Sequence, residues 1–345
     1  MTRLSTTLIL LVFVATTDLF AQTAPVRQAS GNAPIVEPAG PAPAPRVGGP
    51  QAPIAPIPMQ PDWVTQMNPA QLKWVDDVLQ YWETSSEKIK LFECKFQRWD
   101  YDGGFIADGK WQPRTYADGV IKYAQPDKGL YKVEKLILNQ PGAAGQPPQQ
   151  IVQNPELGEH WICNGKEVYS FEANKKQVTV TPLPPQMQGK AIADGPLPFM
   201  FGAKAQTIKA RYWVRNLEGG PEGKYWLEAV PKSRDDAQNF KQVRILLDQK
   251  DFLPDSLEIF GPNFNPPQND ARQTYRFADR KPQDAKSVAA LIGQGLDPLG
   301  IFTREFFEPR IPLGWQKVTQ GGPGNIPAAP QQARPPANPA QPKTR

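Results

Sequence analysis

The chain has 345 residues, with 39 Lys and Arg against 34 Asp and Glu, and a net charge of +5 at pH 7. The two signs are interspersed, as in EKIKLFECKFQRWDYD, so there is no basic block of the kind that binds nucleic acid. A solvated surface of mixed charge is the main interpretation, and weak attraction to an anionic membrane surface is the alternative.

Prolines divide the chain into three parts. Of the 40 prolines, eleven lie in residues 22–61 and seven in residues 321–345. These Pro/Ala-rich ends favour extended polyproline II and cannot form a core. We therefore expect a disordered linker over 22–61, one folded domain over 62–318 and a disordered tail over 319–345. The middle part is long enough to bury a core as a single mainly β or α+β domain.

The first residues are typical of a secretory signal. Arg3 precedes a short apolar run, LILLVFVA, and the small residue Ala21 follows. The run is too short for an ordinary transmembrane helix. We predict a cleaved signal peptide over 1–21 and a periplasmic or secreted protein. An uncleaved anchor is the alternative, since Asp18 lies near the proposed cleavage site.

The chain has two cysteines, Cys94 and Cys163. Export places them in an oxidising compartment, where an even pair can form a disulfide, and we predict that bond. The alternative is two buried thiols, because a free cysteine packs as a small apolar side chain.

A helix is predicted over 69–86. Asn68 suits the N-cap and Pro69 the first helical position, and an apolar stripe follows at helical spacing, formed by Leu72, Val75, Val78, Leu79 and Trp82. Alternating apolar residues then predict strands at 91–101, 119–125, 130–138, 160–171, 177–181, 209–217, 224–230 and 271–277. The turn inside 160–171 is Asn164-Gly165, the strongest short hairpin signal. Residues 139–154, rich in Pro, Gln and Gly, are predicted to form a mobile loop.

The middle of the domain is a predicted hairpin over 243–260. Val243, Ile245 and Leu247 alternate with Arg244, Leu246 and Asp248. A polar turn and Pro254 follow, and Leu257, Ile259 and Phe260 resume an apolar strand. With a short helix over 284–294, the roughly ten strands in hairpin order predict one large antiparallel sheet, curled so that one face holds the core.

Residues 183–202 interrupt the strands. Four prolines and three glycines exclude a regular strand, yet the segment is strongly apolar at Leu197, Phe199, Met200 and Phe201. A loop this apolar must cover something. It is either a plug of the core or a lid over an apolar cavity.

Catalytic chemistry has little support in the sequence. There is one histidine, His160, and no nucleophile elbow, P-loop, zinc-protease or dinucleotide-binding motif. Two cysteines and one histidine do not make a usual zinc site. We predict a non-enzymatic protein with no catalytic residues, metal or cofactor, and keep an enzyme of unrecognised class as an alternative.

Four segments, taken in order, resemble a known family. They are the amphipathic helix leading into Phe92-x-x-x-Phe96-Gln97, the strand Gly119–Pro126, the hairpin Asn164–Tyr169, and Leu247-Asp248 through Leu253-Pro254 with Thr274–Phe277, Phe307–Pro309 and Pro312–Gly314. Together they resemble the periplasmic lipoprotein-carrier family (LolA-like). The segment Gly195–Phe199 is also similar to a planctomycete secreted family of unknown function.

The resemblance implies an unclosed antiparallel half-barrel with helices or loops as lids over an apolar cavity. That family carries acylated lipoproteins, and related proteins of the same fold are envelope sensors. Where the carriers have an Arg that helps hold the lid shut, this chain has Gln125, which lacks the charge. An apolar or acylated ligand, a lipid or lipoprotein, is therefore the expected partner, and gating of the carrier type is in question.

On this interpretation the strand faces supply the site. The candidate lining residues are Phe92, Phe96, Ile121, Tyr123, Val168, Trp213, Val243, Ile245, Leu257 and Ile259. The candidate lid residues are Leu197, Phe199, Met200 and Phe201. A register error of one residue would exchange the two faces. The alternative is an envelope structural, interaction or sensor protein whose cavity is filled by its own side chains.

Overall fold

The computed structural model describes residues 58–107, 109–140, 142, 146, 148–183, 185, 188, 199, 204–294 and 309–320. The predicted signal peptide, nearly all of the linker, most of the tail and the lid residues Leu197, Met200 and Phe201 lie outside this part of the chain.

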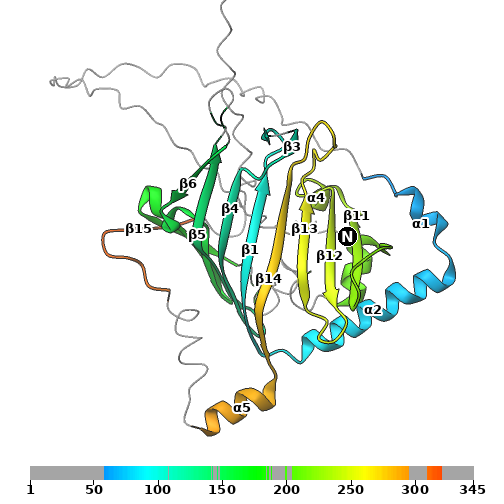
Figure 1. The fold of residues 1–345 in the computed structure, drawn as a ribbon. Helices are drawn as coiled ribbons and strands as arrows, with labels where there is room; N and C mark the ends of the chain where they lie inside the picture. The colour runs from blue at the N-terminus through cyan, green and yellow to red at the C-terminus, as the bar shows by residue number, and fades with distance from the viewer. Residues whose placement is uncertain are drawn as a thin grey trace, which may run out of the picture.

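The described residues form a mainly β structure with short helices (Figure 1). The helices are α1 (Asp62–Gln66), α2 (Pro69–Glu87), α3 (Ala205–Arg211), α4 (Arg234–Ala237) and α5 (Ala285–Gly293). The strands are β1 (Leu91–Tyr101), β2 (Ile106–Ala107), β3 (Lys110–Trp111), β4 (Thr115–Ala124), β5 (Lys128–Gln140), β6 (Gln149–Gln153), β7 (His160–Asn164), β8 (Glu167–Glu172), β9 (Gln177–Pro182), β10 (Tyr212–Asn216), β11 (Lys224–Pro231), β12 (Gln242–Asp248), β13 (Pro254–Phe260), β14 (Arg272–Gln283) and β15 (Gln316–Thr319).

Thirteen of these strands make one open sheet in the order β10-β11-β12-β13-β14-β1-β4-β5-β7-β8-β9-β15, with β6 paired to β5. Among the described strands the sheet does not close, because its end strands β10 and β15 do not pair with each other. The predicted central hairpin is confirmed as β12 and β13, next to β14. Pro254 begins β13, a position where its missing N–H is tolerated.

The predicted helix over 69–86 is confirmed as α2. The Asn68 side chain accepts a hydrogen bond from the Gln71 N–H, and the Gln71 side chain accepts one from the Asn68 N–H, which completes a capping box. The buried stripe of Val75, Leu79 and Trp82 faces the sheet core. In Figure 1, α2 lies along the end of the sheet where β12 and β13 connect.

Three predictions about the strands are wrong. The sheet is mixed, because β15 pairs parallel with β9 across a long separation in sequence. Residues 149–153 form β6, since β5 extends to Gln140 and leaves an edge against which the chain can return. The predicted strand over 209–217 begins only at Tyr212. The residues before it form α3, because Ala, Gln, Lys and Arg are good helix formers and Ala205 and Ile208 share a buried face.

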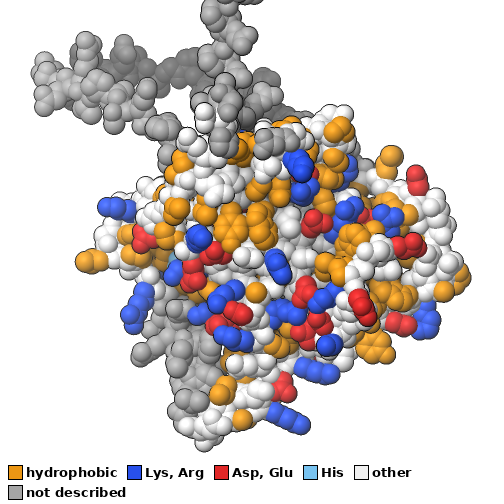
Figure 2. Space-filling model, in the orientation of Figure 1, with side chains coloured by type: hydrophobic (Ala, Val, Ile, Leu, Met, Phe, Trp, Pro, Cys, Tyr) orange, Lys and Arg blue, Asp and Glu red, His pale blue; other side chains and the backbone are white. Residues whose placement is uncertain are grey.

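The sheet has two faces, and different elements cover each. The inner face carries Phe96, Ile121 and Val243, and α2 and α3 pack on it. The outer face carries a smaller cluster around Leu130 and Val180, against which Val288 of α5 and Trp315 pack. Lys, Arg, Asp and Glu are intermixed over the side of the molecule seen in Figure 2, as the sequence predicted.

Candidate functional site

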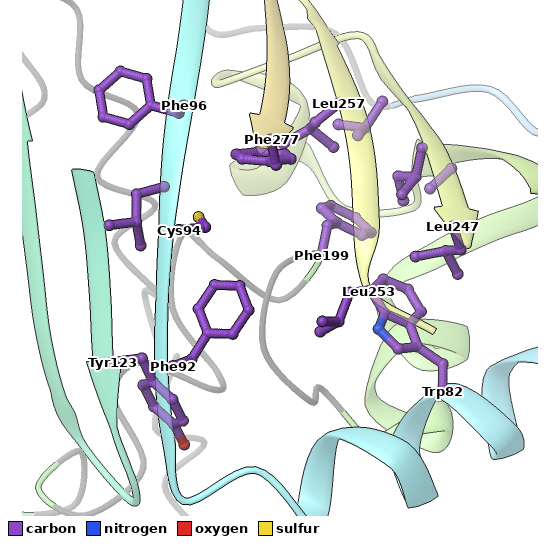
Figure 3. Packing of buried hydrophobic residues seen from close by; sticks show 14 of the residues in the cluster. Trp82, Phe92, Cys94, Phe96, Tyr123, Phe199, Leu247, Leu253, Leu257 and Phe277 are labelled. Atoms are coloured by element: carbon purple, nitrogen blue, oxygen red, sulfur yellow. The ribbon is translucent and has the colours of Figure 1, made fainter. Parts of the chain in front are cut away.

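An apolar cluster covers the inner face from β10 to β8 (Figure 3). Eight of the ten candidate lining residues belong to it, namely Phe92, Phe96, Ile121, Tyr123, Val168, Val243, Ile245 and Leu257. A ninth, Ile259, is partly buried and packs against the cluster. The alternation of each strand places these side chains on one face, and the sheet order brings the strands together. The cluster is the candidate ligand-binding surface.

Trp213, the remaining candidate, lies on the other face. Its neighbours Tyr212 and Val214 belong to or pack against the inner cluster, so the pleat turns Trp213 outward. There it lies under the Lys232 Nζ, 5.9 Å from the ring centroid. The choice of Trp213 is off by one residue along β10, and a shift of one residue exchanges the two faces of a strand.

Phe199 is the one predicted lid residue that the structure describes. It is 4 % exposed and belongs to the inner cluster, with its ring centroid 5.1 Å from that of Tyr212. Phe199 lies between β9 and α3 in the chain, outside the regular elements, whereas its neighbour Tyr212 begins β10. Residues outside the regular elements therefore help to cover the inner face.

The predicted disulfide is wrong, because Cys94 and Cys163 are free and buried. Cys94 lies on β1 and Cys163 on β7, with β4 and β5 between them in the sheet. Neighbouring strands are about 4.8 Å apart, so the two residues are separated by roughly 14 Å, too far for a disulfide. Burial raises the pKa of the Cys94 thiol to about 12 and that of Cys163 to about 11.

A buried arginine lies beside the aromatic part of the cluster. Arg98 is 2 % exposed, and its Nε donates to Asp100 Oδ2 at 3.0 Å and its Nη2 to Glu159 Oε2 at 2.9 Å. Nη1 donates to the Tyr131 hydroxyl at 2.8 Å. Burial alone would lower the pKa of Arg98, but Asp100 and Glu159 raise it well above its usual value. The guanidinium is thus charged and already shared by two carboxylates.

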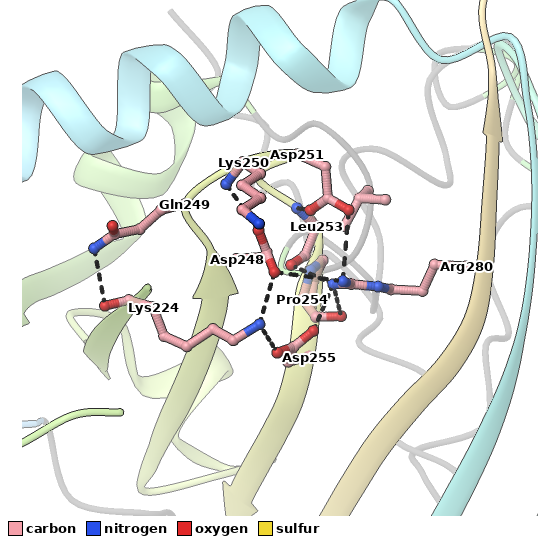
Figure 4. Close-up of polar contacts among 9 residues, drawn as sticks. All are labelled: Lys224, Asp248, Gln249, Lys250, Asp251, Leu253, Pro254, Asp255 and Arg280. Carbon is pink, nitrogen blue, oxygen red and sulfur yellow. Dashed lines mark hydrogen bonds and ion pairs between the residues drawn. The ribbon is translucent and has the colours of Figure 1, made fainter. Parts of the chain in front are cut away.

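A charged cluster fixes the turn between β12 and β13 (Figure 4). The Arg280 Nη1 donates to the Leu253 carbonyl at 2.9 Å and pairs with Asp255 at 2.7 Å. Lys224 pairs with Asp255 and, at 2.7 Å, with Asp248. The hydrogen bond from Lys224 is the largest cause that lowers the pKa of Asp248, to about 2. These contacts hold Leu253 in the inner cluster, where it is 1 % exposed.

A small pocket opens at the end of the sheet near β1, β4 and β14. Its volume is about 20 Å³, and it is lined by Leu91, Phe92, Glu93, Lys122, Tyr123, Lys281 and Gln283. That is space for about one water molecule. An acyl chain does not fit in a pocket of this size.

Other polar candidates have local contacts. The Gln125 Oε1 accepts a hydrogen bond from the Lys90 Nζ at 2.5 Å. His160 stacks on Phe171, with ring centroids 4.2 Å apart. Within the described ranges, no three His, Cys, Asp or Glu residues are placed to hold a metal ion. None of the helices in these ranges is long and apolar enough to cross a membrane.

Sequence reasoning missed Arg98 and the polar ends of Tyr212 and Trp82. A signal for Arg98 was present, because Phe92, Cys94 and Phe96 precede it at alternate positions on β1, which places it on the inner face. Tyr212 was not identified, because its neighbour Trp213 was chosen for the inner face of this strand. Trp82 was identified as a helix-stripe residue, but its indole N–H was not considered.

No family model matches the chain, and no curated protein matches it. Among solved structures, an uncharacterized conserved protein from Thermus thermophilus has a TM-score of 0.35 and 11% identity, over 72% of this chain and 99% of that one. A putative outer membrane lipoprotein-sorting protein domain from Vibrio parahaemolyticus has a TM-score of 0.28 and 12% identity, over 61% and 92%. A LolA superfamily protein from Nitrosomonas europaea has a TM-score of 0.22 and 11% identity, over 61% and 96%.

These likenesses are too distant to assign a function, because each TM-score is below 0.5. Function depends on the residues of the site, not on the fold that carries them.

Proposed function

We propose that this protein binds an apolar or acylated ligand on the inner face of its sheet, without covalent chemistry, in the cell envelope or outside the cell. The observation that supports this is the cover of the inner cluster. Within the described residues, the cluster is not closed by a second large sheet. Among these residues it is covered by α2, α3 and Phe199.

The driving force would be burial of apolar surface. Each Å² of ligand removed from water contributes roughly 25 cal/mol. A ligand pocket typically combines a large apolar lining with a few polar groups, and the inner face has both. Since Phe199 and its neighbours are buried, binding requires that Phe199 move away from Tyr212.

A second candidate function is a structural or interaction protein of the envelope. The close burial of Phe96 and Ile245, at 1 % and 2 % exposed, favours this alternative, because the cluster is already filled by the protein's own side chains. In that case the inner face is an ordinary core, and no ligand displaces Phe199.

Titration of the full chain with a fluorescent 16-carbon acyl probe, checked by native mass spectrometry for one ligand per chain, separates the two. Phe199→Ala removes a ring that the ligand must displace, so we expect the probe to bind at least several-fold more tightly. Phe264→Ala is the control, because Phe264 packs on Phe260, outside the inner cluster.

Wild-type protein that takes up no probe, together with a Phe199→Ala variant that is folded and also takes up none, would contradict ligand binding and leave the structural function. If Phe199→Ala does not fold, the wild-type titration alone decides between the two.

A further inference from the structure

Three strands of the large sheet have a single neighbour among the described strands, and they are β6, β10 and β15. The free edge of such a strand presents backbone N–H and C=O groups to which another strand can add, and proteins usually protect it with charged side chains. β10 carries Arg215 and β15 carries Lys317. β6, which lies beside β5 in Figure 1, has the sequence QQIVQ and carries no charge. Of these three edges, β6 is therefore the least protected against pairing with another strand.

The two apolar side chains of β6 lie at the surface. Val152 is 71% exposed and Ile151 is 37% exposed, and neither belongs to an apolar cluster of the described residues. Val152 ends a row of side chains that crosses the outer face through Trp99, Tyr116 and Ile137, each opposite the next on neighbouring strands. A strand added beside β6 would extend this row and cover both residues, which is a gain of apolar burial.

Prolines limit the length of strand that can pair here. Pro148 precedes β6, and Pro155 follows it after Asn154. Because proline has no N–H to donate to a ladder, regular pairing is confined to the 5 residues of β6. Within the strand, the Gln153 Nε2 contacts the Ile151 carbonyl oxygen at 3.5 Å, which is longer than an ordinary N–H···O bond. An added strand can replace this weak contact.

The strand that suits this edge has neither charge nor proline. A charged partner strand would find no opposite charge on β6. The Pro-rich ends of this chain are unsuited as well, since eleven prolines lie in residues 22–61 and seven in residues 321–345. β6 of a second copy of the chain meets both conditions.

One register uses the whole of β6. An antiparallel pair of identical strands is related by a two-fold axis, so each residue lies opposite a fixed mate. When the axis passes through Ile151, all 5 residues pair: Ile151 with Ile151 of the second copy, Gln150 with Val152, and Gln149 with Gln153. Ile151 lies opposite Leu138 of β5, so an apolar row would continue from Leu138 through both Ile151 side chains into the second copy.

We propose that β6 pairs antiparallel with β6 of a second copy of this chain, centred on Ile151, and forms a symmetric dimer. The pairing joins the two large sheets into one and is independent of ligand binding on the inner face. The assembly closes at two chains, because each copy uses its β6 edge once. Pairing over so short a strand buries less than a standard interface of roughly 1,600 Å², so the dimer is weak and its population depends on concentration.

Cysteine cross-linking tests the register. Ile151→Cys places two thiols directly opposite each other, with Cα atoms about 4.5–5.5 Å apart, which suits a disulfide. Cys94 and Cys163 are buried and do not compete. We expect the full chain with Ile151→Cys to form a covalent dimer under mild oxidation. Gln149→Cys is the control, because two cysteines at that position would lie about 14 Å apart. Adding Gln153→Cys to the control should restore the cross-link.

A charge at the two-fold axis tests the association itself. Ile151→Lys brings two ammonium groups together, so the dissociation constant should rise about tenfold or more. Sedimentation velocity over roughly a hundredfold range of chain concentration measures it. Val318→Lys is the matched control and should change nothing, because Val318 is also 37% exposed and also lies on an edge strand, β15. Circular dichroism checks that both variants are folded.

Three results would overturn the proposal. Wild-type protein could remain a monomer at every concentration, while Ile151→Cys cross-links no faster than Gln149→Cys. A dimer that persists unchanged in Ile151→Lys would place the contact on another surface. Growth beyond two chains would exclude a closed two-fold pairing.

Discussion

Arg98 and Tyr212 bury polar atoms in the same apolar layer in opposite ways. Around Arg98, three nitrogens donate to Asp100, Glu159 and Tyr131, and the charge is balanced within the fold. At Tyr212, the hydroxyl is buried with no partner in the described part of the chain. The first arrangement is complete without a ligand, whereas the second leaves a donor unsatisfied beside Phe199. The difference separates a polar network that is satisfied within the fold from a buried donor with no partner among the described residues.

The largest effect is expected at Arg98. Arg98→Met should lower the free energy of unfolding by about 3–5 kcal/mol, because the buried Glu159 carboxylate and the partly buried Asp100 carboxylate would be left without their cation. Urea unfolding measures the difference. Arg114→Met is the control, since its pair with Asp102 is partly exposed and should change stability by about 1 kcal/mol or less. Equal costs for the two variants would remove the distinction between a closed buried network and a surface pair.

In the charged cluster at the β12–β13 turn, the contribution of Asp248 to stability should depend on pH. The folded pKa of Asp248, about 2, is below the usual value of 3.8, so its contribution is fully present above pH 4 and is lost as the pH falls towards 2. Asp248→Asn should cost about 1–2 kcal/mol at pH 7, discounted for partial exposure, and the difference from wild type should vanish near pH 2.

The cost of Asp248→Asn is measured from the urea unfolding midpoints of the variant and the wild-type protein at pH 7, 4 and 2.5. Asp77→Asn is the control, because the Lys73–Asp77 pair on α2 is exposed and should contribute little at any of these pH values. A constant cost of Asp248→Asn from pH 7 to 2.5 would show that the carboxylate charge is not what holds the turn.

The sequence predicted an individual helix or strand well where the spacing of its apolar residues, or its capping residues, gave a clear local signal. Strand β1 was predicted with its observed bounds, and α2 to within one residue at its end. Both carry signals that depend only on neighbouring residues, namely alternation on β1 and the Asn68-Pro69 start on α2. The inner cluster followed from the same alternation, applied to β4, β8, β12 and β13.

Features that depend on distant parts of the chain could not be predicted in this way. The pairing of β15 with β9 and the position of Cys94 three strands away from Cys163 are set by the order of strands in the sheet. An unpaired hydroxyl is likewise a tertiary property. The sequence contains Tyr212, but only the packing of Phe199 and Phe240 around it shows that no acceptor lies beside its hydroxyl among the described residues.

The same substitution at two tyrosines of the inner face, Tyr131 and Tyr212, compares a hydrogen-bonded buried hydroxyl with an unpaired one most directly. Tyr131→Phe should lower stability by about 1–2 kcal/mol, because it removes the acceptor of the Arg98 Nη1 hydrogen bond. Tyr212→Phe should leave stability unchanged or raise it by up to about 1 kcal/mol, because it removes a buried hydroxyl that has no partner among the described residues. The change from Tyr to Phe thus measures what the hydroxyl contributes to stability at each of the two positions. A loss at Tyr212 as large as that at Tyr131 would mean that its hydroxyl already has a partner.

The smallest effect is expected at the cysteines, where a reductant should not change stability at all. Both thiols are buried with raised pKa values, about 12 and 11, so a thiol reagent at pH 8 should label neither until the chain is unfolded in urea. A Cys94–Cys163 disulfide would instead block labelling in urea and lose several kcal/mol on reduction. Unlike the Tyr212 hydroxyl, a thiol packs in an apolar layer as a small apolar group and needs no partner there. Oxidising conditions therefore leave the pair unjoined, because the sheet order keeps the two residues apart.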